Sequence, residues 1–88
     1  MASISFPTCT TTEEIRKNGA TWLYAKKCSG LHLLRSIAKG LYPELLSEVG
    51  PDDDLEVVRV NRDYSRGETR ITETEVFSCS GWSIEDCL

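Results

Sequence analysis

The sequence predicts an α+β fold in which two or three helices pack on one face of a small antiparallel sheet with a C-terminal β-hairpin. Between residues 12 and 49, apolar residues recur at the three- and four-residue intervals of a helix. After residues 52–54 the apolar period changes to two, the period of a half-buried strand. With 88 residues, 40% hydrophobic and 27% charged, the chain is long enough for one core, so we expect a single domain over residues 1–88.

The first seven residues predict a short strand and no export. Residues 2–6 alternate, with Ile4 and Phe6 apolar, and Pro7 ends the pattern. This stretch lacks the basic and apolar segments of a secretory signal. No apolar run approaches the roughly 18 residues that a membrane span needs. We therefore expect a cytoplasmic or otherwise intracellular protein that makes no membrane contact.

Residues 12–28 are predicted to form a first helix. Thr11 and Glu14 are spaced as a capping box, and Ile15, Trp22 and Leu23 share one face at helical spacing. A rival interpretation is a helix over 12–18 followed by a strand over 20–27. It is kept open because Asn18-Gly19 is also a helix stop and the residues after it suit a strand.

The next segment predicts two further helices. The stripe Leu31, Leu34, Ile37, Ala38 and Leu41 is amphipathic, and Gly40 stands where a helix would close. Proline in a helix interior removes a backbone donor, whereas a first turn tolerates it. We therefore expect a break at 40–42 and a short helix over 43–49 that begins at proline.

The second half predicts a β-hairpin. Residues 55–62 are rich in valine, and residues 70–77 are rich in threonine, valine and aromatic side chains. The intervening segment contains Arg66-Gly67, where we expect the chain to turn. The expected core combines both halves of the chain: Ile15, Trp22, Leu34, Ile37, Leu41, Leu45, Val58, Val60 and Phe77.

The cysteines are expected to be free thiols. Four are spread along the chain: Cys9, Cys28, Cys79 and Cys87. A chain without an export signal stays in a reducing compartment, and a buried free cysteine behaves as a small hydrophobe. The spacings lack the close pairs of a zinc site. Cys28 and His32 have the spacing of a thiol–imidazole couple on one helix face, but Ser29-Gly30 interrupts such a helix.

No cofactor, metal or catalytic residue is predicted. The chain has no phosphate-binding glycine loop and no hydrolase or zinc-protease motif. Residues 52–54 are three adjacent aspartates, yet the alternating oxygens of a calcium loop are missing. We interpret these aspartates as a solvated loop that discourages edge-to-edge pairing.

The charges are uneven along the chain. The formal net charge is −4, with more basic than acidic residues before position 51 and the reverse after it. Such polarity can orient a charged partner, unless folding mixes the two halves. We favour the interpretation that folding mixes the two halves and cancels the charge asymmetry.

The hairpin carries the candidate contact surface. Its basic and aromatic residues are Arg59, Arg62, Tyr64, Arg66 and Arg70. Arginine and tyrosine are over-represented among binding hot spots, so the sequence favours a non-enzymatic module that binds or regulates another protein. Cross-strand pairing of these arginines with nearby carboxylates is the structural alternative.

Nucleic-acid binding is the alternative function. Three helices followed by a hairpin is the element order of a winged helix, whose hairpin often touches phosphates. The predicted helix 43–49 has two acidic residues and no basic one, and residues 52–54 would repel a duplex. A thiol enzyme built on Cys28 is the third and weakest alternative.

Overall fold

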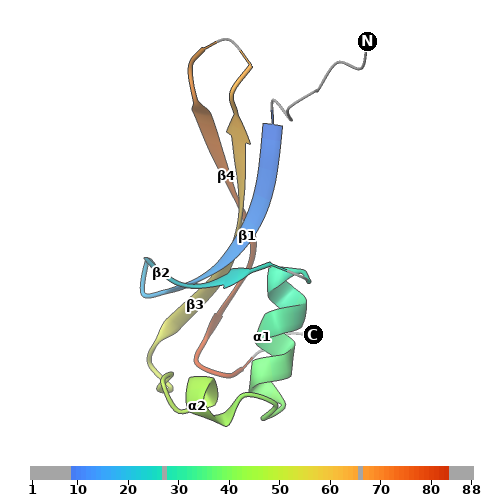
Figure 1. The fold of residues 1–88 in the computed structure, drawn as a ribbon. Coiled ribbons are helices and arrows are strands. Elements are labelled where there is room, and N and C mark those ends of the chain that lie inside the picture. Colours follow the sequence, from blue (N-terminus) through green and yellow to red (C-terminus); the bar gives the residue numbers. More distant parts are fainter. Residues whose placement is uncertain (1–8, 27, 66, 84–88) are drawn as a thin grey trace, which may run out of the picture.

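The computed structural model describes residues 9–26, 28–65 and 67–83. These residues form four strands and two helices in the order β1 (Cys9–Lys17), β2 (Ala20–Ala25), α1 (Gly30–Ala38), α2 (Pro43–Leu46), β3 (Asp54–Asp63) and β4 (Arg70–Ser80). The strands make one antiparallel sheet in the order β2-β1-β3-β4 (Figure 1). The α+β class holds in outline, with more strand and less helix than the sequence predicted.

The helix predicted over 12–28 is wrong, because this segment is the β1–β2 hairpin. Asn18 (φ 53°) and Gly19 (φ 84°) both adopt left-handed conformations, as the two central residues of a type I′ turn must. The rival interpretation is right about the strand after the turn and wrong about helix 12–18. Asn18-Gly19 therefore reverses a strand instead of ending a helix.

The winged-helix element order is also absent from the described residues. The observed order is two strands, two helices and two strands. Since the first predicted helix is a hairpin that pairs with β3, residues 9–26, 28–65 and 67–83 do not contain the three-helix unit on which a winged helix depends.

The two later helices confirm their predicted positions. Ser29 caps α1, its hydroxyl oxygen accepting a hydrogen bond from the His32 N–H at 3.1 Å. Leu34 and Ile37 of α1 are buried against the sheet. The short helix α2 begins at Pro43 as expected but ends at Leu46.

The predicted C-terminal hairpin is present and longer than expected. β3 extends the predicted strand 55–62 at both ends. β4 begins where the predicted strand 70–77 begins and extends it at its C-terminal end. The register shifts between Val57 and Val58, which pair with Phe77 and Glu75, so Val76 is an extra residue, a β-bulge. The predicted turn residue Arg66 and the predicted strand 2–6 lie outside the described residues.

The core lies between α1 and one face of the sheet. Ile15, Leu34 and Ile37 are fully buried there, as predicted, and Trp22, Leu45 and Phe77 are partly buried against them. Three unpredicted residues, Val49, Leu55 and Val57, complete this core. Leu41 was expected in the core and is instead 67% exposed, because α1 ends at Ala38 and leaves it in the connection to α2.

The sheet extends well beyond its helical cover. The molecule measures 53 × 24 × 22 Å, with both helices at one end and β1, β3 and β4 projecting from it (Figure 1). We call this projecting part the arm and define it as residues 9–12, 59–65 and 67–74. In the part of the chain that the structure describes, neither helix has the length and apolarity of a membrane crossing.

Candidate functional site

The arm holds every described residue of the predicted contact surface. Arg59 and Arg62 belong to β3, Arg70 to β4, and Tyr64 lies in the connection between these strands, 45% exposed. Arg66 lies outside the described residues. The predicted residues thus occur along one hairpin, but they do not form one surface.

Strand alternation separates the arginines onto two faces of the sheet. We call the face of Ile15 and Val57, which α1 covers, the helix face, and the opposite face the open face. Arg59 is on the helix face and Arg62 on the open face, because residues three apart in a strand point in opposite directions. The structure therefore does not bring these two arginines together.

Each of these arginines is held by a neighbour from β1. Arg59 bonds to the Oε2 atom of Glu13 at 3.2 Å through both its Nε and its Nη2. Arg62 donates from Nη1 to the hydroxyl oxygen of Thr12 at 3.0 Å. Both side chains are thus oriented before any partner arrives, and the pairing partners differ from the hairpin carboxylates considered as the structural alternative.

The tip of the arm is ordered around Asp63. Its Oδ1 accepts a hydrogen bond from the Ser65 N–H at 2.9 Å, and Arg70 stands opposite it in register. Hydrogen bonds from Ser65 hold the pKa of Asp63 below its usual range, and the charge of Arg70 adds to this effect. These residues and Glu68 line an open hollow of about 330 Å³.

The open face carries a charge cluster that the sequence did not reveal. Arg16 donates a hydrogen bond from Nε to Glu14 Oε1 at 2.6 Å. Its Nη2 and Nη1 donate to Oε1 and Oε2 of Glu73 at 2.8 and 3.1 Å. This bridge runs from β1 to β4, so it crosses β3 where Val58 and Val60 are only 3% and 2% exposed. The two valines are buried, as predicted, but beneath polar side chains and outside the α1 core.

The charges in this cluster stabilise one another. Hydrogen bonds that Arg16 donates to Glu73 and Glu14 raise the pKa of Arg16. In return, the hydrogen bonds and charge of Arg16 lower the pKa of Glu73, with a smaller contribution from Arg62. Glu14 is 5% exposed and also accepts a hydrogen bond from the Thr21 hydroxyl at 3.1 Å. The cluster closes this part of the open face.

Glu13 joins the arm to the helical end. Its Oε1 accepts the Gly30 N–H at 2.7 Å, at the first turn of α1, while its Oε2 binds Arg59. A carboxylate at this position satisfies an otherwise unpaired helix N–H and suits the positive end of the helix dipole. The orientation of Arg59 and the start of α1 therefore depend on the same side chain.

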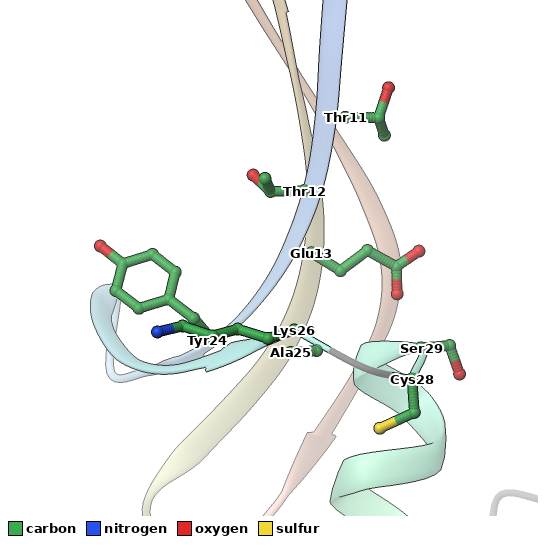
Figure 2. A pocket seen from close by; sticks show the side chains of 8 residues that line it. All are labelled: Thr11, Thr12, Glu13, Tyr24, Ala25, Lys26, Cys28 and Ser29. Atoms are coloured by element: carbon green, nitrogen blue, oxygen red, sulfur yellow. The ribbon is translucent and has the colours of Figure 1, made fainter.

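A cavity opens where β2 leaves β1. The pairing between these strands ends at Glu13 and Ala25, and no described strand flanks residues 9–12 on that side. The cavity beside them has a volume of about 500 Å³ and is lined by Thr11, Thr12, Glu13, Tyr24, Ala25, Lys26, Cys28 and Ser29. Figure 2 shows Thr12 and Tyr24 on one side of β1, and Thr11, Glu13 and Ser29 on the other.

The prediction of buried cysteines is wrong for Cys9 and Cys28, whereas Cys79 packs against the apolar core. Cys9 and Cys28 are exposed, Cys79 is half-buried, and Cys87 lies outside the described residues. Cys28 precedes Ser29, the cap of α1, so Cys28 and His32 do not share a helix face, as the intervening Ser29-Gly30 indicated. His32 is not among the residues that line the cavity with Cys28.

Two of the three aspartates at 52–54, Asp53 and Asp54, form hydrogen bonds within the fold. Asp53 accepts hydrogen bonds from the Asn18 side chain at 3.0 Å and from the Gly50 N–H at 2.9 Å. These bonds, with the charge of Lys17, lower the pKa of Asp53. Among the residues that the structure describes, no group of three or more His, Cys, Asp or Glu side chains is placed to hold a metal ion.

Comparison with known proteins adds nothing to this geometry. No family model, no curated protein and no solved structure matches the chain.

Proposed function

We propose that this chain is a non-enzymatic module that binds or regulates another protein, and that the arm is its contact surface. One observation carries the proposal: the arm projects from the helical end with its tip and most of its side chains exposed (Figure 1), while Arg59, Arg62 and Asp63 are held by internal contacts. An exposed but ordered surface loses less conformational entropy when a partner binds.

The tip supplies the side chain best suited to anchor a partner. Tyr64 is 45% exposed, and Arg70 and Asp63 beside it offer opposite charges. A tyrosine presents a large, rigid contact area with one polar group, which is why tyrosine is frequent at binding hot spots. Arg62, on the open face near the tip, extends this surface.

Affinity capture from a native lysate tests this proposal, with half of each sample treated with nuclease. The bait variants are Tyr64→Ala and the triple variant R62A/Y64A/R66A. The control is Tyr42→Ala, because Tyr42 is 41% exposed and lies in the connection between the two helices, away from the arm. Truncating a hot spot costs at least about 2 kcal/mol, so partner recovery should fall roughly 30-fold or more.

The outcomes separate the alternatives. The proposal expects the same proteins with the wild type and the control, with or without nuclease, and their loss with the triple variant. Equal recovery by the triple variant would remove the arm as the contact surface. Recovery that depends on intact nucleic acid would replace the protein partner with a nucleic acid.

Nucleic-acid binding is a second proposal, favoured by one observation on α1. Arg35 and Lys39 are exposed one helical turn apart, and neither forms an ion pair within the described residues. Filter binding of duplex and single-stranded DNA and RNA at two salt concentrations tests it, because phosphate contacts weaken steeply with salt. If micromolar protein shows no salt-sensitive binding, this second proposal fails.

A further inference from the structure

We infer that the open edge of β1, residues 9–12, pairs with the same edge of a second copy of this chain. In an antiparallel ladder, the N–H and C=O of successive residues point alternately to the two neighbouring strands. The Asn18 N–H donates to the Asp54 carbonyl of β3 at 2.8 Å, so even-numbered residues of β1 face β3. The N–H and C=O of Cys9 and Thr11 therefore point to the edge that β2 leaves open.

This edge lacks the features that protect the other edges of the sheet. Charged side chains, proline and bulges normally prevent edge strands from pairing. The free edge of β4 carries Glu73 and Glu75 and the bulge at Val76. β2 has an irregularity opposite the step from Ile15 to Arg16. In contrast, residues 9–12 read Cys-Thr-Thr-Thr, with no charge, and their pairing with β3 is regular.

A two-fold register matches the free groups of the two copies. If Thr10 lies opposite Thr10 of the second copy, each Cys9 lies opposite a Thr11. Both residues of each such pair point their N–H and C=O toward the other strand, so each pair exchanges two hydrogen bonds. Threonine opposite threonine is a favourable cross-strand pair, and a closed two-fold contact forms a dimer and not a fibre.

The surroundings leave space for this second strand. The cavity of about 500 Å³ lies beside Thr11 and Thr12, at the point where Ala25 ends the pairing of β2 (Figure 2). Because the two β1 strands run antiparallel, the helical ends of the two copies lie at opposite ends of the dimer (Figure 1). The shared ladder is short, so the association is weak and depends on concentration. Residues 9–12 belong to the arm, but this pairing uses the main chain of β1 and none of the side chains proposed above to contact a partner protein.

A charge-swap experiment tests the register. Sedimentation equilibrium of the purified protein from about 10 µM to about 1 mM covers the Kd range of a weak contact. Thr10→Lys and Thr10→Glu each place like charges opposite one another at the two-fold axis, so each variant alone should stay monomeric. An equimolar mixture should recover dimer at or above the wild-type level. A monomeric wild type at about 1 mM, or a mixture that stays monomeric, would overturn the inference.

Main-chain variants and amide exchange test the same edge independently. Thr11→Pro removes an outward N–H and should abolish the dimer. Ile71→Pro is the matched control, because the register places the Ile71 N–H on the free edge of β4. The Ile71→Pro variant should still form the dimer. The Cys9 and Thr11 amides should exchange quickly in dilute protein and slowly in concentrated protein, while those of Thr10 and Thr12 stay slow. Protection of Cys9 and Thr11 in dilute, monomeric protein would show the edge covered within one chain and contradict the inference.

Discussion

At the scale of single residues, Gly30 begins α1 where the helix comes closest to the sheet. A Cβ atom at this position would lie 2.6 Å from Cγ1 of Val57, and Val57 is fully buried. The added Cβ would therefore collide with the short, branched side chain of Val57, which is enclosed by the core and has no room to move. The close approach also allows the Gly30 N–H to reach Glu13 at 2.7 Å.

We expect Gly30→Ala to lower the free energy of unfolding by about 1–3 kcal/mol, as overpacking does in other cores. Helix propensity alone predicts the opposite sign, since alanine is favoured over glycine by up to about 1 kcal/mol. Urea denaturation measures the difference. Gly50→Ala is the control, because the nearest atom to its added Cβ is 3.7 Å away. A Gly30→Ala protein as stable as the wild type would contradict this packing.

The Arg16–Glu73 bridge predicts how stability depends on pH. Arg16 lowers the pKa of Glu73 in the folded state, so the unfolded state binds more protons as the pH falls. Stability from this pair is complete above the unfolded pKa, about 4.3, and is lost as the pH falls through the lower folded value. The lowered pKa values of Asp53 and Asp63 act in the same direction.

We therefore expect the denaturation midpoint to decrease between about pH 5 and pH 3, and to decrease less steeply in Glu73→Gln. Glu75→Gln is the matched control: Glu75 lies on the same face of β4 and forms no ion pair within the described residues. An unchanged slope in Glu73→Gln would show that the bridge does not contribute to acid stability.

At the scale of elements, the Asn18-Gly19 turn decides the structure of the first half. Gly19 has a φ of 84°, and nothing lies within 4 Å of a Cβ added there, so a substitution changes only the backbone energy. Gly19→Ala should destabilise the protein by roughly 1–2 kcal/mol, the usual difference for a left-handed residue with a side chain. Thermal or urea unfolding measures this loss. No loss of stability would mean that the β1–β2 turn is not held in this conformation.

Two of the elements that the sequence predicted, α1 and β3, have an apolar pattern that lies directly against the core. The stripe with Leu34 and Ile37 gave α1, and the valines of 55–62 gave β3. β1 was missed because only Ile15 of this strand belongs to the apolar core, while Glu14 is buried by Arg16 and Thr21 on the other face. That burial depends on charges from different elements, so no apolar period marks it.

The candidate site was predictable in part. The sequence predicted the arginines of the hairpin as contact residues. Strand alternation alone would have placed Arg59 and Arg62 on opposite faces of the sheet. Their partners Glu13 and Thr12 depend on β1 lying beside β3, which the helical assignment of 12–28 excluded. The open edge at residues 9–12 depends on where β2 leaves the sheet, a property of the sheet order and not of a motif.

At the scale of the whole molecule, the fold mixes the basic first half with the acidic second half. Arg16–Glu73 and Glu13–Arg59 each join a residue of the first half to one of the second. Of these two ion pairs, Arg16–Glu73 offsets the charge asymmetry along the chain, because it joins a basic residue of the basic half to an acidic residue of the acidic half. What remains distinctive is the shape, an arm that projects from one end of a 53 Å molecule.

Amide hydrogen exchange, measured on the free protein and on its complex with the captured partner, tests the role of the arm most directly. If the arm is the contact surface, exchange slows at the amides of residues 59–65 and 67–74 and stays unchanged in α1 and α2. Slowing confined to α1 and α2, with the arm exchanging as in the free protein, would contradict it.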